Sequence, residues 1–260
     1  MNTLGWIVLL TGAGGVASVL LAGAFLLAPH KVRDHLLPHL ISFATGSLLG
    51  AALLGLLPHA MIAAGQGAAH EVGAAVLGGF ALFFVLEKMV LWRHCHMDEC
   101  ESHGPTHEHR AKASGTLILV GDGIHNALDG VLIAAAFLTD WHLGLVTAIA
   151  VMTHEIPQEV GDFAILLRSG MSRTRALTLN ALSGLTSVLG AVIAYYALAD
   201  ALHVLPYALA VAAASFLYVA VADLIPGLHR HVDLRSSSAQ VVLIAAGVAV
   251  ILFAEHYAHG

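Results

Sequence analysis

Charged side chains are scarce in this sequence. Asp, Glu, Lys and Arg together make up 11% of its 260 residues, and hydrophobic residues make up 58%, whereas an average soluble domain carries about 25% charged residues. This composition excludes an ordinary soluble enzyme. The chain also lacks a basic block, with 11 Lys and Arg against 17 Asp and Glu, so we expect no nucleic-acid partner.

Cysteine is nearly absent as well. Cys95 and Cys100 are the only two cysteines and share one polar segment, so no disulfide framework organises the fold. Histidine, in contrast, is abundant, with 18 residues.

Eight apolar runs account for most of the chain, each near the length of about 20 residues that crosses a bilayer as a helix. They cover approximately residues 4–28, 37–62, 69–92, 113–138, 143–167, 175–199, 204–226 and 238–258. Together they leave no room for a separate soluble domain. The sequence therefore predicts an all-α, multi-pass membrane protein with a single transmembrane domain over residues 1–260. The first run lacks the basic start of a secretory signal, so we expect a retained helix.

Basic residues predict the orientation of these helices. Every Lys and Arg falls in or beside the first, third, fifth or seventh connection between the runs, and none lies in the even connections or at the termini. The positive-inside rule then places the odd connections in the cytoplasm and both termini outside the cell membrane.

A short internal repeat joins the second and seventh runs. Residues 47–58 align without gaps on residues 215–226, from a Ser at the start to a Pro at the end. Because the charge rule makes these two runs cross in opposite directions, the repeat indicates the inverted halves that transporters use for alternating access. Coincidence between two Leu- and Ala-rich helices that end in Pro is the alternative.

Ionisable residues interrupt the fourth and fifth runs, where no Lys or Arg occurs between Lys112 and Arg168. Five acidic residues lie inside these two spans: Asp122, Asp129, Glu155, Glu159 and Asp162. A charge at the bilayer centre costs at least about 2.5 to 3.5 kcal/mol on insertion scales and is usually paired. Without a basic partner, these carboxylates require protons, water or a bound cation.

The spacing of the polar residues favours a cation, because residues at i, i+3, i+4 and i+7 share one helical stripe. In the fourth run these are Asp122, His125, Asn126 and Asp129. In the fifth run, His154 and Gln158 share one stripe, and Glu155, Glu159 and Asp162 share the adjacent one. Imidazole and carboxylate ligands suit divalent Zn, Fe, Mn or Co. Both sets lie near mid-span, so we expect one metal site between the two helices.

Two motifs carry a family resemblance. HNALD at residues 125–129 and HEIPQE at residues 154–159, followed by VGDFAILL, resemble the paired signatures of the ZIP (Zrt-/Irt-like) family of divalent metal transporters. The resemblance implies movement of zinc, and often of iron, manganese or cadmium, into the cytoplasm through a site between helices four and five. It also implies a three-plus-two-plus-three arrangement of helices with inverted outer triplets, and a transported metal rather than a cofactor.

The resemblance also assigns residues. His125 and Asp129 match ligands of the family's primary site. Asn126 and Glu155 match residues of an adjoining second site, and His154 matches a motif histidine at the same level.

Three positions depart from the family pattern. Gln158 stands where the family usually has His or Glu, Gly55 where many relatives have His or Met, and Ser187 where some bacterial relatives have Glu. We therefore expect one transport site with a looser neighbour, and not a tightly held two-metal centre.

Further polar residues fit a pathway around this site. Asp122, Glu159, Asp162 and, in the seventh run, Asp223 are candidates for it; a place in the helix interface without a role in transport is the alternative for Asp223. The third connection, at about residues 93–112, is rich in residues that bind metals. These are His94, Cys95, His96, Cys100, His103, His107 and His109. Their spacing matches no closed zinc fold, so a mobile cytoplasmic metal acceptor is the favoured interpretation, and a solvated loop with incidental histidines is the alternative.

Two other functions compete with transport of a metal. An intramembrane zinc-dependent hydrolase would use a zinc-bound water, but Gln158 occupies the position of the second His in a His-Glu-x-x-His motif. A proton-coupled carrier of organic solutes would not need such a dense His and carboxylate cluster. Small residues along helices one, two, six and seven permit either close packing or a homodimer.

Overall fold

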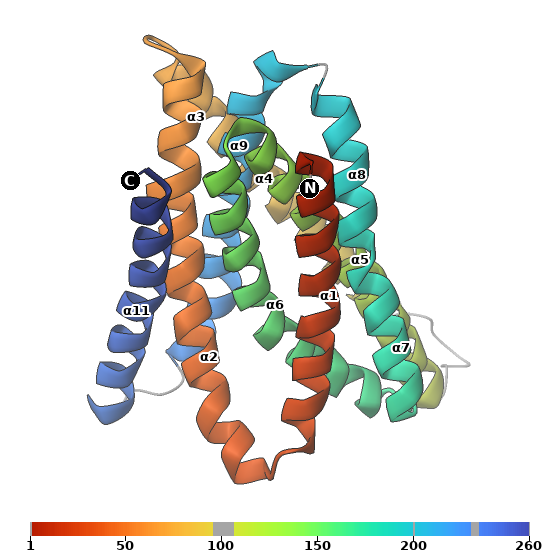
Figure 1. The fold of residues 1–260 in the computed structure, drawn as a ribbon. Coiled ribbons are helices and arrows are strands. Elements are labelled where there is room, and N and C mark those ends of the chain that lie inside the picture. Colours follow the sequence, from red (N-terminus) through yellow and green to blue (C-terminus); the bar gives the residue numbers. More distant parts are fainter. Residues whose placement is uncertain (1, 96–106, 200, 230–233, 260) are drawn as a thin grey trace.

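The computed structural model describes residues 2–95, 107–199, 201–229 and 234–259. Within these residues the chain forms eight long helical segments (Figure 1) and no strand. Helices suit a bilayer because each one satisfies its own backbone hydrogen bonds. The predicted all-α class is confirmed, and the segments follow the apolar runs closely.

Five of the eight segments are single helices. They are α1 (Thr3–Leu27), α4 (Ala69–Cys95), α5 (His107–Thr139), α6 (Trp141–Arg168) and α11 (Leu234–His259).

The other three segments are interrupted. The second consists of α2 (His30–Gly50), the π-helix η1 (Ala51–Leu56) and α3 (Leu57–Ala64). The sixth consists of α7 (Arg173–Gly184) and α8 (Thr186–Ala199). The seventh consists of the short 3₁₀-helix η2 (Leu202–Val204), α9 (Leu205–Tyr218), the π-helix η3 (Val219–Leu224) and α10 (Ile225–Leu228).

The outer surface of the bundle is apolar, as a membrane protein requires. Among the described residues, six of the segments are long and apolar enough to cross a membrane. The remaining two, α5 and α6, hold the buried ionisable residues Asp122, Asp129, His154, Glu155 and Glu159. Large apolar side chains such as Leu20, Leu77 and Val241 are more than half exposed. Acyl chains would cover them, because water would disfavour so much exposed apolar surface.

Side-chain caps and glycines fix several helix ends. The Asn2 Oδ1 accepts a hydrogen bond from the Gly5 amide at 2.9 Å at the start of α1. At the start of α6, Asp140 Oδ1 accepts from the amides of His142 at 2.8 Å and Leu143 at 3.0 Å. Both contacts satisfy amides that have no partner within the helix. Gly170, with φ of 87°, lies in the left-handed region between α6 and α7, where a side chain would be strained.

The two π-helices lie at equivalent places in the internal repeat. Both η1 and η3 begin at the fifth residue of their aligned copy, and Pro58 or Pro226 follows at the start of the next helix. The Leu57 amide donates to the Ala52 carbonyl, and the Ile225 amide donates to the Ala220 carbonyl. Each of these bonds joins two residues that are five positions apart, as in a π-helix. Widening the helix relieves the clash of a proline ring with the carbonyl four residues earlier.

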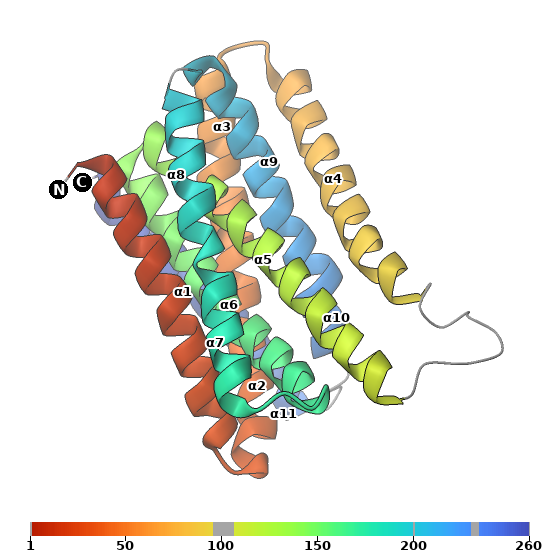
Figure 2. The same ribbon diagram turned by 90° about the vertical axis from the view of Figure 1, so that its right-hand side faces the viewer.

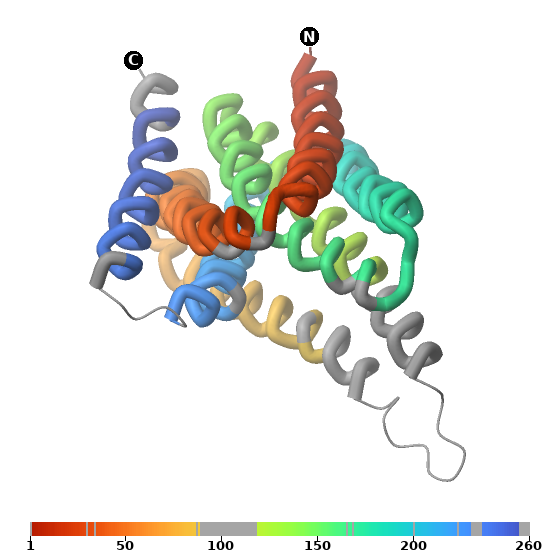
Figure 3. Tube along the Cα trace, turned by 90° about the horizontal axis from the view of Figure 1, so that it is seen from below, coloured from red at the N-terminus to blue at the C-terminus, as the bar shows by residue number. Residues whose placement is uncertain are grey.

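Helix pairs pack in a regular pattern. α2 packs against α11, α4 against α9, α5 against α8 and α1 against α6; Figure 3 shows α11 at the rim beside α2. Glycines permit two of these contacts. A Cβ on Gly46 would overlap the Ile244 carbonyl of α11, and a Cβ on Gly130 would overlap the Ser187 carbonyl of α8. The α2–α3 and α9–α10 segments run in opposite directions (Figure 2).

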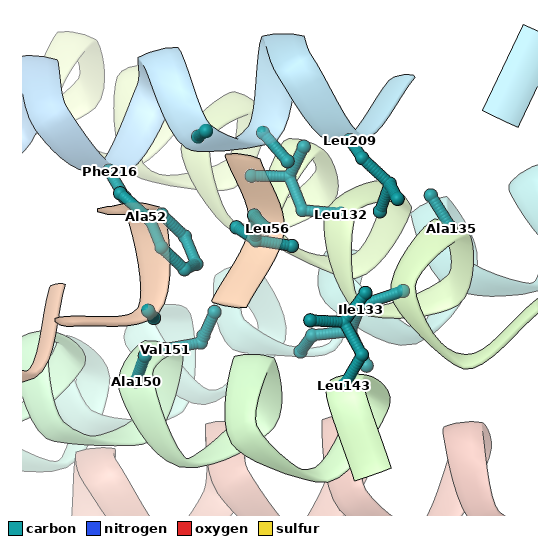
Figure 4. Close-up of a cluster of buried hydrophobic side chains, with 14 of the residues drawn as sticks. Ala52, Leu56, Leu132, Ile133, Ala135, Leu143, Ala150, Val151, Leu209 and Phe216 are labelled. Carbon is teal, nitrogen blue, oxygen red and sulfur yellow. The ribbon is translucent and has the colours of Figure 1, made fainter. Parts of the chain in front are cut away.

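An apolar core fills the half of the bundle towards the α5–α6 connection. Most helical segments contribute to it, and residues of η1, α5, α6 and α9 lie at its centre, among them Leu56, Ile133, Val151, Leu209 and Phe216 (Figure 4). A smaller apolar cluster of Phe163, Leu166 and Ala176 lies towards the α6–α7 connection. In sequence, the buried polar residues of α5 and α6 fall between these two clusters.

Candidate metal-binding site

The polar stripe of α5 is buried as the sequence predicts. Asp122, Asn126 and Asp129 are each less than 5% exposed, and His125 is half-buried. The Asn126 Nδ2 donates to the Asp122 backbone carbonyl at 3.1 Å and to Asp122 Oδ1 at 2.9 Å. Asn126 therefore orients the Asp122 carboxylate.

α6 supplies the opposite wall through His154, Glu155 and Glu159, all buried. The His154 Nδ1 lies 3.2 Å from the Ala150 carbonyl oxygen. A carbonyl oxygen only accepts, so this contact places a hydrogen on Nδ1, and the neutral ring then has its lone pair on Nε2. Backbone contacts of this kind commonly fix the orientation of a metal-binding histidine.

Four side chains from the two helices form a first cluster. One donor atom from each of His125, Asp129, His154 and Glu155 lies within 4.8 Å of the others. His154 Nε2 is 3.2 Å from Asp129 Oδ2 and 3.7 Å from Glu155 Oε1. His125 Nε2 is 3.3 Å from His154 Nε2. Tetrahedral zinc with ligands at about 2.0 to 2.1 Å separates them from one another by about 3.3 Å, which is close to these spacings.

A second cluster adjoins the first and shares Glu155 with it. One carboxylate oxygen from each of Asp122, Glu155 and Glu159 lies within 4.8 Å of the others. α5 begins after the third connection, and α6 ends before the fifth. Asp122 and Glu159 therefore lie closer to these two odd-numbered connections than His125 and His154 do. Glu155 therefore lies at the boundary between the two clusters.

Both clusters contain carboxylate oxygens that accept no hydrogen bond from a described residue. Buried oxygens that have no hydrogen-bond partner among the described residues occur on each carboxylate, and they are Asp122 Oδ2, Asp129 Oδ2, both oxygens of Glu155 and Glu159 Oε1. Leaving a buried charge unpaired is strongly unfavourable. Because no Lys or Arg occurs in this part of the sequence, the arrangement is chemically suited to hold a cation.

The other expected positions lie around these clusters. Gln158 is half-buried, and its side chain faces Asp122 in the second cluster. Asp162 is half-buried one turn beyond Glu159 and is outside both groups of atoms. The Ser187 hydroxyl donates to the Gly184 carbonyl at 2.7 Å, so its hydrogen is used within its own helical segment, at the join of α7 and α8.

Several predicted residues lie outside the described parts of the structure. The loop residues His96, Cys100 and His103 are outside the described ranges. The side chains of His94, Cys95, His107, His109 and Asp223 are also outside the described residues, although their backbones belong to helices. The metal-acceptor loop and the role of Asp223 therefore remain predictions.

The sequence reasoning missed Asn180. This residue of α7 is 1% exposed, and its Nδ2 donates to Glu159 Oε2. A polar residue inside an apolar span was the available signal. That signal is weak, because helical spacing does not show which residue of another helix faces Glu159.

The fold and this cluster define a multi-pass membrane protein with a buried, acceptor-rich site between two central helices. A family model described as ZIP zinc transporter matches residues 92–255. The chain belongs to this family.

Comparisons with individual proteins also give zinc transporters of the ZIP family. The chain is 36% identical over 232 residues to zinc transporter ZIP13 of Pongo abelii, covering 83% of this chain and 66% of that protein. It is 33% identical over 253 residues to ZIP13 of Mus musculus, covering 83% and 69%, and 34% identical over 258 residues to ZIP4 of Mus musculus, covering 75% and 39%. The matches thus span about two thirds of the ZIP13 proteins and less of ZIP4. These relatives are transporters and not enzymes, so the hydrolase alternative is not supported.

Proposed function

We propose that this protein transports divalent metal ions, zinc foremost, across the cell membrane into the cytoplasm. The observation that carries the proposal is the first cluster, in which two imidazoles and two carboxylates from α5 and α6 bring their donor atoms together without a basic partner. Membership of the ZIP zinc transporter family supports the same substrate. Iron, manganese and cadmium are further candidate ions, because this mixed ligand set suits several divalent metals.

The ligand set also suits transport better than storage. A transported ion must bind well enough to lose water and weakly enough to leave. Four side chains of mixed type, only some of them charged, meet this condition better than a cage of thiolates. We assign His125, Asp129, His154 and Glu155 as ligands of the transported ion, with Asn126 and Gln158 orienting or completing the neighbouring cluster.

We further propose that the bundle consists of two inverted triplets of helical segments around α5 and α6. The first triplet runs from α1 to α4, and the second runs from α7 to α11. The π-helices η1 and η3 support this arrangement, because they occupy the same register of the repeat. The packing pattern also supports it. Exchanging the two triplets turns the α4 and α9 pair into the α11 and α2 pair, and turns the α1 and α6 pair into the α8 and α5 pair. Relative movement of such halves gives alternating access.

The apolar core would block the ion in the present conformation. The buried Phe216 ring lies 6.1 Å from the His154 ring, centroid to centroid, and the core continues from it towards the α5–α6 connection. Under the predicted orientation, this is the outer side. Entry of the ion therefore requires α9 to move relative to α6.

The test is metal influx into proteoliposomes that contain the purified full chain and enclose a zinc dye, with cadmium and manganese in parallel. Transport predicts saturable influx that is lost in His125→Ala. An exposed histidine of η2, His203, provides the matched control as His203→Ala, which should transport normally. Tight zinc binding without influx, in well-reconstituted protein, would contradict the proposal.

We assign the loop at about residues 93–112 as a cytoplasmic metal acceptor. Seven His and Cys residues between His94 and His109 support this assignment. Shortening residues 94–109 should change the rate or the regulation of influx and spare basal transport. Complete loss of influx in a well-folded shortened protein would instead make the loop part of the transport path.

A further inference from the structure

An open groove runs along the outer surface of the bundle between α5 and the α7–α8 segment, which lie side by side (Figure 2). Its volume is about 660 Å³, within the range of about 300 to 1,000 Å³ that is usual for ligand sites. On the α7–α8 side its lining extends from Leu179 to Ile193, a length of about 21 Å at 1.5 Å per residue. One leaflet supplies about half of the 30 Å hydrocarbon core of a bilayer. The groove is therefore long enough for an acyl chain of one leaflet.

Small residues at the contact between α5 and α8 create this groove. Gly190 of α8 is buried, and a Cβ there would overlap the carbonyl of Ala127 in α5. Both residues line the groove. Larger apolar side chains of the lining, such as Val120 of α5 and Leu182 of α7, are more than half exposed. The two segments thus approach closely where the residues are small, and larger side chains stand beside the contact.

The lining of the groove favours hydrocarbon over a polar ligand. Ser183 and Thr186 are its only residues with polar side chains. Ser183 Oγ donates to the Leu119 carbonyl at 3.3 Å, and Thr186 Oγ1 lies 2.6 Å from the carbonyl oxygens of both Gly123 and Ser183. Each hydroxyl has a single hydrogen, so both are engaged within the protein. An apolar groove in the membrane-facing surface is a site for an acyl chain.

Arg175 lies at the end of the groove that is nearer to the connection between α6 and α7. It precedes Leu179 by four positions, so the two residues share a stripe of α7. Helical side chains tilt towards the N-terminus of their helix, which directs the exposed Arg175 side chain beyond the groove towards this connection. Arg173 is exposed in the same turn.

These two arginines have no acidic partner. Among the described residues, neither Arg173 nor Arg175 forms an ion pair, and the sequence contains no Asp or Glu between Asp162 and Asp200. The first turn of a helix such as α7 also favours a negative charge through the helix dipole. The end of the groove is therefore complementary to an anion.

We propose that this groove binds an anionic phospholipid, with one acyl chain between α5 and the α7–α8 segment and the phosphate at Arg173 and Arg175. A guanidinium suits a phosphate because it can donate two parallel hydrogen bonds. Under the predicted orientation, this end of the groove faces the cytoplasmic leaflet, where anionic lipids are concentrated. Lipid binding at the groove does not depend on transport of a metal.

A bound acyl chain would also cover the protein surface next to the second cluster. Ser183 is buried in the lining of the groove, and its side chain faces Asp122. Lipid in the groove would keep water from this side of Asp122. A ligand that binds only the folded state stabilises it, so an anionic phospholipid should raise the melting temperature of the protein.

The test is native mass spectrometry of the purified full chain in detergent, with added phosphatidylglycerol or phosphatidylcholine of identical acyl chains. The wild type should bind phosphatidylglycerol more tightly than phosphatidylcholine. Arg175→Gln should weaken binding of phosphatidylglycerol about fivefold, the effect of one basic residue near an anionic surface, and leave phosphatidylcholine unchanged. Lys88→Gln is the matched control, because it removes the same charge from an exposed residue of α4, which does not line the groove.

Ala127→Leu tests the apolar part of the site separately. A larger side chain at this lining position should fill the groove and weaken binding of both lipids, although both arginines are still present. Arg175→Gln changes only an exposed side chain, so its result does not depend on how well Ala127→Leu folds.

Three outcomes would overturn the proposal. The first is equal affinity of the wild type for the two lipids. The second is a loss of phosphatidylglycerol binding in Arg175→Gln no larger than in Lys88→Gln, which would indicate diffuse attraction to positive charge. The third is a dimer that excludes lipid and disappears in Ala127→Leu, which would assign the groove to a second copy of the chain.

Discussion

His154 Nε2 lies 3.2 Å from Asp129 Oδ2, and in a neutral ring whose Nδ1 donates to the Ala150 carbonyl both of these atoms are acceptors. Two buried acceptors at this distance repel each other unless a positive charge lies between them. His125 Nε2 and Glu155 Oε1 lie within 4 Å of the same nitrogen. A metal ion that contacts all four atoms satisfies every one of them at once.

This geometry predicts that His154 contributes directly to zinc affinity. His154→Ala should weaken zinc binding to the purified protein by roughly tenfold or more, on the scale seen for perturbed metal sites. Competition with a zinc dye measures the change. An affinity equal to that of His203→Ala, in which an exposed histidine is removed, would show that His154 is not a ligand.

Close contact between α5 and α8 predicts that Gly130 cannot be replaced by a larger residue without loss of stability. A Cβ there would overlap the Ser187 carbonyl, so Gly130→Ala forces the helices apart and should cost about 1 to 3 kcal/mol, as overpacking does. Gly78→Ala is the matched control, because a Cβ on Gly78 in α4 meets nothing within 4 Å. Thermal unfolding in detergent compares the two. Equal melting temperatures would contradict the packing of α5 on α8.

The cap of α6 predicts a pH-dependent contribution to stability. Burial alone would raise the pKa of Asp140, but its hydrogen bonds from the Leu143 and His142 amides and the nearby His142 and His59 rings lower it below the ordinary value of 3.8. A lowered pKa in the folded state means that the carboxylate stabilises the fold above the ordinary pKa. This contribution is lost as the pH falls through the lowered value.

Asp140→Ala should therefore destabilise the protein by about 0.5 to 2 kcal/mol near neutral pH, the usual cost of losing a helix cap. The difference from wild type should shrink as the pH is lowered through the acidic range. Asp140→Asn keeps an oxygen for the cap and should show a smaller loss. A difference in melting temperature that stays constant down to acid pH would contradict this role of the charge.

Much of the architecture could be predicted from composition alone. Apolar length located all eight helical segments, because a bilayer permits few other structures. It missed the start of α2 at His30, since polar residues at the beginning of a helix extend it beyond its apolar run. The π-helices were not predicted, although their cause, a proline at the end of each repeat copy, was visible in Pro58 and Pro226.

Only part of the candidate site could be predicted from the sequence. Helical spacing brought Asp122, His125, Asn126 and Asp129 to one face correctly, because all four lie on a single helix. Spacing says nothing about which residue of another helix lies opposite. Asn180 of α7 was missed for that reason, and the division of the carboxylates into two clusters around Glu155 became visible only in three dimensions.

The predicted orientation can be tested with thiol labels. Gln66, in the exposed connection between α3 and α4, and Ser172, between α6 and α7, lie on opposite sides of the membrane under the charge rule. In a protein with Cys95 and Cys100 replaced by Ser, a membrane-impermeant reagent added to intact cells should label Gln66→Cys. Ser172→Cys should react only after permeabilisation. The reverse pattern would invert the direction of transport proposed here.

Zinc influx in Asp129→Ala, measured beside wild type at matched amounts of reconstituted protein, tests the central claim most directly. Asp129 is 1% exposed and its Oδ2 lies nearest to His154 Nε2 in the first cluster. If this cluster holds the transported ion, influx falls at least roughly tenfold, as expected when a metal ligand is lost, while the protein remains folded and inserted. Saturable influx at the wild-type rate would show that the ion crosses the membrane by another route.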